Sequence, residues 1–467
     1  MKKYIVMLVV IGVTVFSGLI YGVKMILDQK EAVKIEYEVL EGDSTVAAGI
    51  SFHVRNQWSG KLHWDSHVIL GEGGKVVKAV TELEDRFDNP TEEDYFPYHR
   101  LYEKVDFYLE YNGIALEDTW IQASGCDLEQ SIMKMLESCA AETKPGETKT
   151  QLVPLEEYQE YYDLILNLNL DSGSYHAVGS EWELQQEFMR IKIPESHQMK
   201  VTVQKDQQGN IVMQRCECAY GLQTVECCSI QTADGVYFVI YGVDTEGQPY
   251  DLSFDCGNGI FCIPLTTVEE EQKSACSAET VIDYGGAKNV FPLFGEDCYP
   301  LELITDEEEQ ELYLLTKEQD KAVLRIIDKK AMKEKQRLEL IDNPYYWNEQ
   351  QIDILEDGLV VLLGDNSFCY LEEKNGVMEK KIAVNIGEGP RPSDGKYDYD
   401  LIYRDGKAAL LIAEYGNGST EAYVYVLNEN GVEYKAHFMP SFAYESYHGG
   451  SDWIHLRKEE PLEITVE

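Results

Sequence analysis

The chain has 467 residues, of which 84 are acidic and 40 are basic, so its formal charge is −44. Such acidity repels nucleic acid and anionic lipid headgroups and argues against a polyanion-binding function. With 44% hydrophobic residues and 31 Tyr, the chain is too apolar and aromatic to be disordered.

The first predicted element is a transmembrane helix. Residues Tyr4 to Val23 carry no charge and follow Lys2 and Lys3. A bilayer core of about 30 Å needs about 20 apolar residues, whereas the apolar run of a cleaved signal peptide is about 7 to 15 residues long. We therefore predict that residues 1–30 form a short cytoplasmic tail and a single-pass membrane anchor, with the body extracytoplasmic. A cleaved signal peptide is the alternative.

Residues 31–199 are predicted to form a β-rich region with one or two short helices. Apolar and polar residues alternate with period two in several segments, as in half-buried strands. These predicted strands are Val33 to Leu40, Gly49 to Asn56, Lys61 to Leu70 and Val105 to Tyr111. A helix is predicted from Asp127 through Cys139, and a weaker one from Leu155 to Leu164.

Residues 200–467 are predicted to form a β-propeller-like domain. Strands at Lys200 to Gln204 and Gly235 to Tyr241 precede three copies of a four-strand pattern whose second strand is the most apolar. The equivalent positions Leu312, Leu359 and Ala408 recur about every 48 residues, a period typical of a propeller blade. The fold class is therefore mainly β. β-sandwich or meander domains are the alternative.

Several short segments resemble a group of uncharacterised membrane-anchored proteins of Gram-positive anaerobic bacteria. They are Tyr37 to Asp43, Gly49 to Phe52, Leu62 to Asp65, Glu157-Tyr158 with Tyr161-Tyr162, and Ile191 to Pro194. The resemblance covers most of the body. It implies an extracytoplasmic location and a propeller-like fold, but no reaction and no functional residues.

Eight of the eleven cysteines lie between Cys216 and Cys298. A hairpin turning near Gly221 would place Cys216 opposite Cys228, or Cys218 opposite Cys227, within disulfide range. A disulfide, buried thiols and a metal site all stay open for these four cysteines. Cys256 and Cys262 are a second potential pair, closing a small loop.

Three potential metal ligands share one face of the strand Lys61 to Leu70. His63, Asp65 and His67 alternate with Trp64 and its apolar neighbours. The number of donors suits a zinc site, but such sites normally take ligands from more than one element. A polar, solvated strand face is the alternative interpretation.

Acidic runs suggest calcium as a further potential cofactor, because hard cations bind carboxylate oxygens. The runs are Glu92 to Asp94, Glu269 to Glu271 and Asp306 to Glu309. None has the spacing of an EF-hand loop, so solvated loops are the alternative. The sequence also lacks the G-x-S-x-G and H-E-x-x-H motifs and the glycine patterns of phosphate or dinucleotide binding.

Together these features favour a membrane-anchored binding or sensing module without an identified activity. Its partner would be an envelope protein, peptide or glycan, contacted by aromatic loops such as Asn343 to Trp347 and Asp394 to Asp398. The alternative is a hydrolase acting on envelope glycan or peptide, with acids supplied by several blades.

Overall fold

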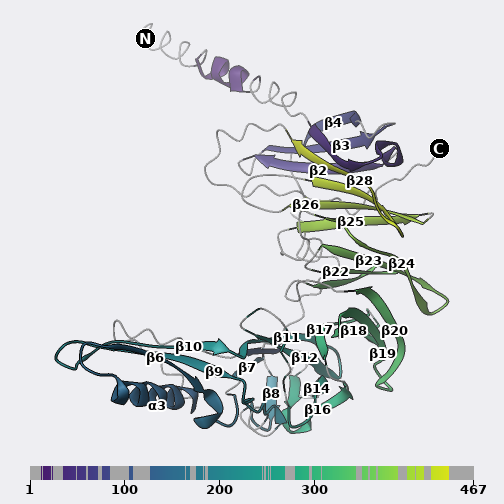
Figure 1. The fold of residues 1–467 in the computed structure, drawn as a ribbon. Helices are drawn as coiled ribbons and strands as arrows, with labels where there is room; N and C mark the ends of the chain where they lie inside the picture. Colours follow the sequence, from purple (N-terminus) through teal and green to yellow (C-terminus); the bar gives the residue numbers. More distant parts are fainter. Residues whose placement is uncertain are drawn as a thin grey trace, which may run out of the picture. The chain divides into compact units, whose positions relative to one another are not determined.

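The structure is a computed structural model, and it confirms the prediction of a mainly β protein (Figure 1). It divides into two compact units, one formed by residues 1–98 with 355–467 and the other by residues 99–354. The residues that it describes are 12, 14–22, 24, 35–48, 50–58, 62–71, 76–84, 105–108, 127–162, 165–168, 175–181, 184, 188–244, 246, 249–250, 252, 254–268, 279–293, 297–306, 308–342, 350–355, 358–363, 366–387, 397–404, 406–414 and 422–440.

The predicted repeat is present as three consecutive four-stranded antiparallel sheets, each with its strands in chain order. The first contains β17 (Cys298–Thr305), β18 (Glu311–Glu318), β19 (Lys321–Asp328) and β20 (Lys333–Asp342). The second contains β21 (Gln351–Leu355), β22 (Gly358–Leu363), β23 (Ser367–Lys374) and β24 (Val377–Asn385). The third contains β25 (Tyr397–Arg404), β26 (Lys407–Glu414), β27 (Ala422–Asn428) and β28 (Gly431–Pro440).

The second strand of each repeat is largely buried, as its composition predicts. All six residues of β22 are buried. In β26, Leu410 and Ile412 pack toward β22 and β23, while Ala409 and Leu411 pack toward the other side of the sheet. Since successive residues of a strand point to opposite faces, a strand covered on both faces has to be apolar throughout.

The N-terminal strand completes the C-terminal sheet. β1 (Ile35–Gly42) pairs antiparallel with β28, so the third repeat has a fifth strand in the order β1-β28-β27-β26-β25. The ring of Tyr37 stacks on Phe438 with centroids 5.9 Å apart. The first and last strands that the structure describes thus belong to the same sheet.

A three-stranded sheet packs against this C-terminal sheet. It contains β2 (Ser51–Trp58), β3 (Leu62–Leu70) and β4 (Val76–Glu84), and it follows the short 3-10 helix η1 (Ser44–Ala47). Phe52 and Val68 share a core with Leu411, Val424 and Phe438. Figure 1 shows β2 and β3 beside β28 and β26.

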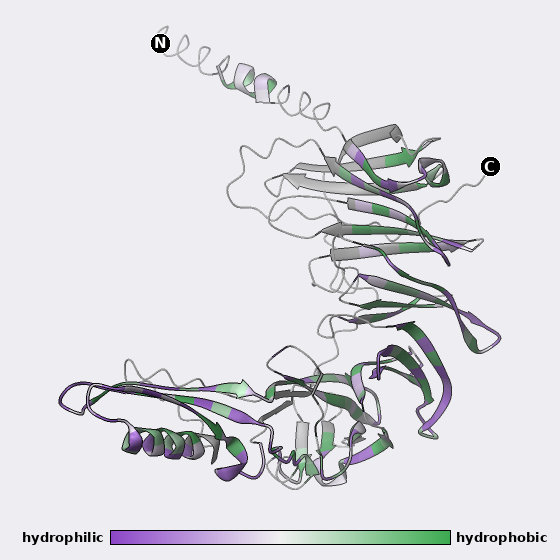
Figure 2. Cartoon of the chain, in the orientation of Figure 1, coloured by the Kyte–Doolittle hydropathy of each residue, from purple (hydrophilic) through white to green (hydrophobic). Residues whose placement is uncertain are grey.

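Besides the first repeat, the second unit contains a three-stranded sheet, a seven-stranded sheet, a two-stranded sheet and the predicted helix, α3 (Asp127–Glu142). α3 covers one face of the three-stranded sheet β10-β9-β6, and Figure 2 shows that hydrophobic and hydrophilic residues alternate along the helix. These strands are β6 (Thr148–Pro154), β9 (Gln198–Lys205) and β10 (Ile211–Tyr220). Because β6 pairs with β9, the predicted domain boundary between residues 199 and 200 lies inside one sheet.

The larger sheet of this unit has seven strands and packs against the first repeat. Its main order is β11-β12-β14-β15-β8, with β13 and β16 added at β12 and β14. The strands are β8 (Tyr175–Val178), β11 (Leu222–Gln231), β12 (Gly235–Asp244), β13 (Pro249–Tyr250), β14 (Gly259–Val268), β15 (Glu279–Asp283) and β16 (Lys288–Pro292). Val239 and Ile260 share a core with Leu312 and Leu314 of β18.

The remaining short elements differ in part from the predicted ones. Of the strand predicted from Val105 to Tyr111, the structure describes β5 (Val105–Tyr108), which pairs with β7 (Ile165–Leu168). The weak helix predicted from Leu155 to Leu164 is wrong, since only the 3-10 turn η2 (Leu155–Glu157) forms. A second 3-10 turn, η4, covers Tyr284–Gly286.

The predicted membrane anchor lies partly outside the described residues. Within it, residues 12 and 14–22 are helical. Among the residues that the structure describes, none belongs to a helix of the length and apolarity that a bilayer crossing requires.

Gly42 tests the closure of the C-terminal sheet by β1. It has a φ of +86°, and a Cβ atom there would come within 3 Å of the backbone of Glu433 and Tyr434. We expect Gly42→Ala to destabilise the protein by about 1–3 kcal/mol from the steric clash, in addition to the φ strain, and to speed amide exchange in β1. Thermal unfolding and hydrogen exchange followed by mass spectrometry measure both effects.

Gly406→Ala is the matched control, because Gly406 has a similar φ of +81° but no atom within 4 Å of the added Cβ. This substitution should lower the stability only by the backbone strain at φ > 0, and the amides of β1 should stay protected from exchange. Equal effects of the two substitutions would contradict a tight β1–β28 junction.

Candidate functional site

The predicted metal ligands His63, Asp65 and His67 occupy alternate positions of β3. Their backbone is part of the sheet β2-β3-β4, while their side chains lie outside what the structure describes. The proposed binding loop Asn343 to Trp347 also lies outside the described residues, as does the part of the second loop before Tyr397.

The cysteine hairpin is wrong. β10, with Cys216 and Cys218, pairs with β9, whereas β11, with Cys227 and Cys228, pairs with β12 in another sheet. The chain passes from one sheet into the next at Gly221 instead of folding back. All nine cysteines that the structure describes are thiols, so the proposed Cys216–Cys228 and Cys218–Cys227 disulfides are not formed.

The second proposed pair is also separated by its sheet. Cys256 packs against the core that contains α3 and β9, whereas Cys262 of β14 belongs to the core shared with the first repeat. Closing this small loop with a disulfide would require one of the two cysteines to leave its core.

The described residues contain one polar cluster that combines a thiol with an imidazole. His197, immediately before β9, has no exposed surface. Its Nδ1 shares a hydrogen bond of 2.8 Å with the hydroxyl of Tyr162, and its Nε2 lies 3.5 Å from Sγ of Cys218. The thiol of Cys218 also lies 3.6 Å from the carbonyl of Leu222, a geometry in which it can donate.

Backbone contacts fix the three side chains of this cluster. The amide of Leu155 donates to the carbonyl of His197 at 3.0 Å, and the amide of Tyr162 donates to that of Ile191 at the same distance. The imidazole fits only because residue 221 is Gly: a Cβ atom there would lie 2.9 Å from the ring. Gly221 also has a φ of +115°, which side chains rarely allow.

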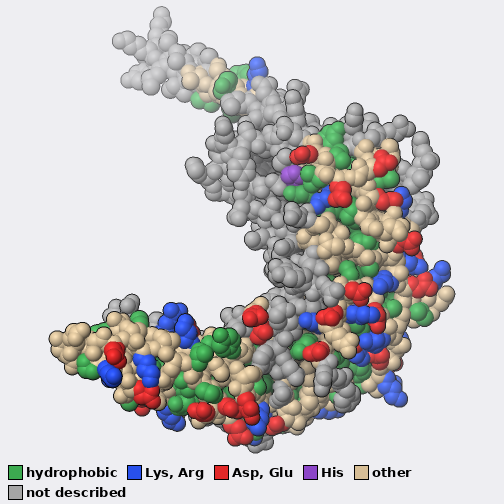
Figure 3. Space-filling model, in the orientation of Figure 1, with side chains coloured by type: hydrophobic (Ala, Val, Ile, Leu, Met, Phe, Trp, Pro, Cys, Tyr) green, Lys and Arg blue, Asp and Glu red, His purple; other side chains and the backbone are tan. Residues whose placement is uncertain are grey.

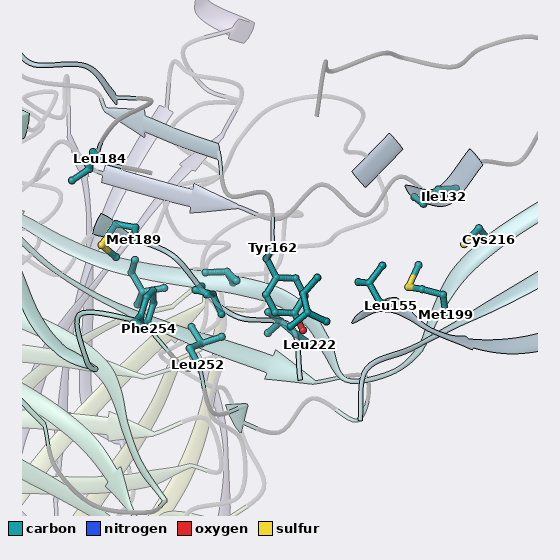
Figure 4. Packing of buried hydrophobic residues seen from close by; sticks show 14 of the residues in the cluster. Ile132, Leu155, Tyr162, Leu184, Met189, Met199, Cys216, Leu222, Leu252 and Phe254 are labelled. Atoms are coloured by element: carbon teal, nitrogen blue, oxygen red, sulfur yellow. The ribbon is translucent and has the colours of Figure 1, made fainter. Parts of the chain in front are cut away.

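Apolar side chains surround the cluster. Figure 4 shows Tyr162 next to Leu222, with Leu155 and Met199 in the same layer of buried residues. Cys216 is also part of this layer and is almost completely buried. The cluster therefore links the sheet β10-β9-β6 to the start of β11 through buried side chains.

Burial keeps the thiol and the imidazole neutral. It lowers the pKa of His197 to about 4 and raises the pKa of Cys218 to about 11. It also raises the pKa of Cys216 to about 12. A nucleophilic cysteine needs the opposite shift, toward a thiolate stabilised by a cationic partner. The cluster is thus suited to holding the chain in place rather than to nucleophilic catalysis.

The acidic run at Asp306 serves local structure in its described part. The carboxylate of Asp306 accepts hydrogen bonds from the amides of Gln310 and Glu311 at 2.7 and 2.8 Å. Glu309 accepts from the amide of Ala233 at 3.0 Å and lies 3.5 Å from the ammonium group of Lys329. The run thus closes a turn and links the first repeat to the β11–β12 turn, while Glu92 to Asp94 and Glu269 to Glu271 lie outside the described residues.

Lys329 is the centre of that link. It is 9% exposed, and its Nζ lies 2.6 Å from Asp234, which also accepts a hydrogen bond from the hydroxyl of Tyr237 at 3.0 Å. Among the described residues, no group of three or more His, Cys, Asp or Glu side chains could hold a metal ion.

No known protein family matches the chain, and no curated protein matches it. Among solved structures, the chain is similar to the β-propeller domain of Cps50 (Swd1) from Myceliophteria thermophila, at 9% identity, a TM-score of 0.21, and coverage of 51% of this chain and 82% of that one. It is also similar to a protein from Lactobacillus plantarum, at 10% identity, a TM-score of 0.21, and coverage of 63% of this chain and all of that one. At TM-scores this low, neither likeness carries an argument.

The buried imidazole predicts that stability falls in mild acid. The pKa of His197 is about 4 in the folded chain and about 6.5 in the unfolded chain, so between these pH values only the unfolded chain binds this proton. The contribution of His197 to the free energy of unfolding is therefore complete above pH 6.5. It decreases by about 3 kcal/mol in all as the pH falls toward 4. Unfolding midpoints measured from pH 7 to pH 4 test this.

Many carboxylates titrate in the same range, so the comparison is between variants. His197→Gln should show a shallower loss of stability between pH 6.5 and 4 than the unsubstituted chain. His437→Gln, which removes an imidazole stacked on Tyr423 instead, should keep the steeper loss. Parallel pH profiles for all three proteins would rule out this role of His197.

Proposed function

We propose that the protein is a membrane-anchored extracytoplasmic binding or sensing module built on a propeller-like scaffold. The observation that carries this proposal is the repeated four-stranded sheet with an inner strand buried on both faces. Sheets of this kind support turns and outer strands that remain for contact with a partner.

The pairing of β1 with β28 supports the propeller-like arrangement. A propeller is a closed series of radially packed sheets, so the first and last parts of its chain must meet. Here the N-terminal strand belongs to the last sheet, and the next sheet, β2-β3-β4, packs directly on it. An open meander would leave the two ends of the chain apart.

The outer strands support a binding function. Charged side chains of both signs are paired between these strands and the end of β18: Arg325 of β19 lies 2.8 Å from Glu318 of β18 and 2.5 Å from Glu334 of β20, and Arg337 of β20 lies 2.5 Å from Glu318. On the face drawn in Figure 3, Lys and Arg side chains lie among Asp and Glu side chains. Charged outer strands resist edge-to-edge aggregation and leave polar contacts for an envelope protein, peptide or glycan.

The anchor is supported by the sequence of residues 4–23, which is long and apolar enough for a bilayer. We expect the full chain to stay in membranes washed with carbonate, and protease added to cells without their wall to digest its body. Ile11→Arg should shift the protein toward the soluble fraction, because a charge at the middle of the span costs about 2.5–3.5 kcal/mol. Ile11→Leu is the matched control.

Recovery of the unsubstituted chain in the cytosol would refute the location. The choice between binding and hydrolysis needs a second experiment, in which the purified full chain is incubated with isolated envelope. We expect saturable binding and an unchanged mass spectrum of the glycan and peptide material. Release of defined fragments would refute the binding role and favour the envelope hydrolase.

A further inference from the structure

The link between the first repeat and the β11–β12 turn holds one amine between two carboxylates. Its three charged side chains come from separate turns: Asp234 lies between β11 and β12, Glu309 between β17 and β18, and Lys329 between β19 and β20. Nζ of Lys329 lies 2.6 Å from Oδ1 of Asp234 and 3.5 Å from Oε2 of Glu309. An amine and a carboxyl group in contact are the two halves of an amide.

Backbone hydrogen bonds keep these turns together. The amide of Lys329 donates to the carbonyl of Gln310 at 3.0 Å, next to Glu309. The amide of Ala233 donates to Oε2 of Glu309 at 3.0 Å, next to Asp234. Groups held in contact react as parts of one molecule, with effective concentrations that reach about 10⁵–10⁸ M. Placement in the fold can therefore drive a reaction that is unfavourable between free amines and acids in water.

Both oxygens of the Asp234 carboxylate accept hydrogen bonds from hydroxyl groups of buried residues. Oδ1 accepts from Thr232 at 2.7 Å, and Oδ2 accepts from Tyr237 at 3.0 Å. Burial raises the pKa of Tyr237, so its phenol stays a proton donor. Donors in these positions stabilise the negative charge that develops on the oxygens when a nucleophile adds to a carboxyl carbon.

The protonation state of Asp234 shows what else the reaction requires. Partial burial acts to raise the pKa of Asp234, but the hydrogen bonds from Lys329 and Thr232 outweigh it, so that the pKa is lowered. Asp234 is therefore a carboxylate. An ammonium group paired with it has no free lone pair, so attack requires a base beside the nitrogen. Glu309 occupies that place.

We propose that Lys329 and Asp234 form an amide cross-link, with Glu309 as the general base. Nζ of Lys329 bonds to Cγ of Asp234, and the bond from Cγ to one carboxylate oxygen breaks. That oxygen leaves as water, with two protons that come from the ammonium group through Glu309. Glu309 ends as a carboxylate, and no further reactant is needed. The side chain of Asp234 is 62% exposed, which gives the water a path to solvent.

The cross-link closes a junction that otherwise depends on packing. It joins the β11–β12 turn to the β19–β20 turn, beside the core that Val239 shares with Leu314. The nine cysteines that the structure describes are all thiols, so none of them closes this junction with a disulfide. The proposal depends neither on the membrane location nor on the binding function.

Mass spectrometry of the full chain, purified in detergent, tests the proposal. We expect the intact protein to be lighter by one water molecule than its sequence requires. A protease digest should give one branched peptide that contains both Asp234 and Lys329. Glu309→Gln keeps the size of the side chain but removes the base, so this variant should retain the water and give two separate peptides.

Lys321→Met is the matched control for Lys329→Met. Lys321 forms an ion pair with Glu339 in the same sheet, but its side chain is 43% exposed. Lys321→Met should still lose one water, whereas Lys329→Met should not. This pair of variants also separates the cross-link from a succinimide, which Asp234 could form with the amide of Gly235 without any lysine.

Three results would overturn the proposal in whole or in part. The full sequence mass in the unsubstituted chain, with separate peptides for Asp234 and Lys329, would remove the cross-link, whatever the folding of the variants. A loss of water that persists in Lys329→Met would assign that loss to a succinimide. A branched peptide in Glu309→Gln would remove the role of Glu309 as the base.

Discussion

Coverage of both faces of small β-sheets is the constraint on which this structure depends. A four-stranded sheet cannot hide its apolar faces by itself, so each repeat needs a neighbour on either side. β26 meets this need with two alternating sets of residues, Leu410 and Ile412 on one face and Ala409 and Leu411 on the other. For the last repeat, the N-terminal strands β2 and β3 supply the cover on one face.

This constraint also explains where polar groups occur. Two groups of buried polar side chains are engaged with one another, the cluster of Tyr162, His197 and Cys218 and the link between Lys329 and Asp234. Both lie where one sheet meets another, and a buried polar contact with fixed geometry specifies such a junction more sharply than apolar packing does. Outside the stacks, charges can vary freely, which is where an interaction surface can develop.

The repeats could be predicted from the sequence because the pattern that identifies each strand lies within that strand. Alternation gives the strands, and an apolar second strand marks the position covered on both faces. The pairing of β1 with β28 could not be read in this way, since it joins segments at opposite ends of the chain. The predicted cysteine hairpin is wrong for a related reason: a glycine is compatible with a tight turn, but at Gly221, with a φ of +115°, the chain passes into another sheet. The His197 cluster was missed because its members are distant in sequence and match no motif.

The face of β3 shows how far local and tertiary information can combine. Alternation alone placed His63, Asp65 and His67 together, but it gave no ligand from a second element. The register places His53 opposite His67, and the packing of Phe52 and Val68 buries alternate positions of the same two strands. Because side chains alternate with period two, the burial of one set of residues dictates which residues meet on the other face. The pairing that builds the core therefore also decides which residues of β2 and β3 lie opposite each other at the alternate positions.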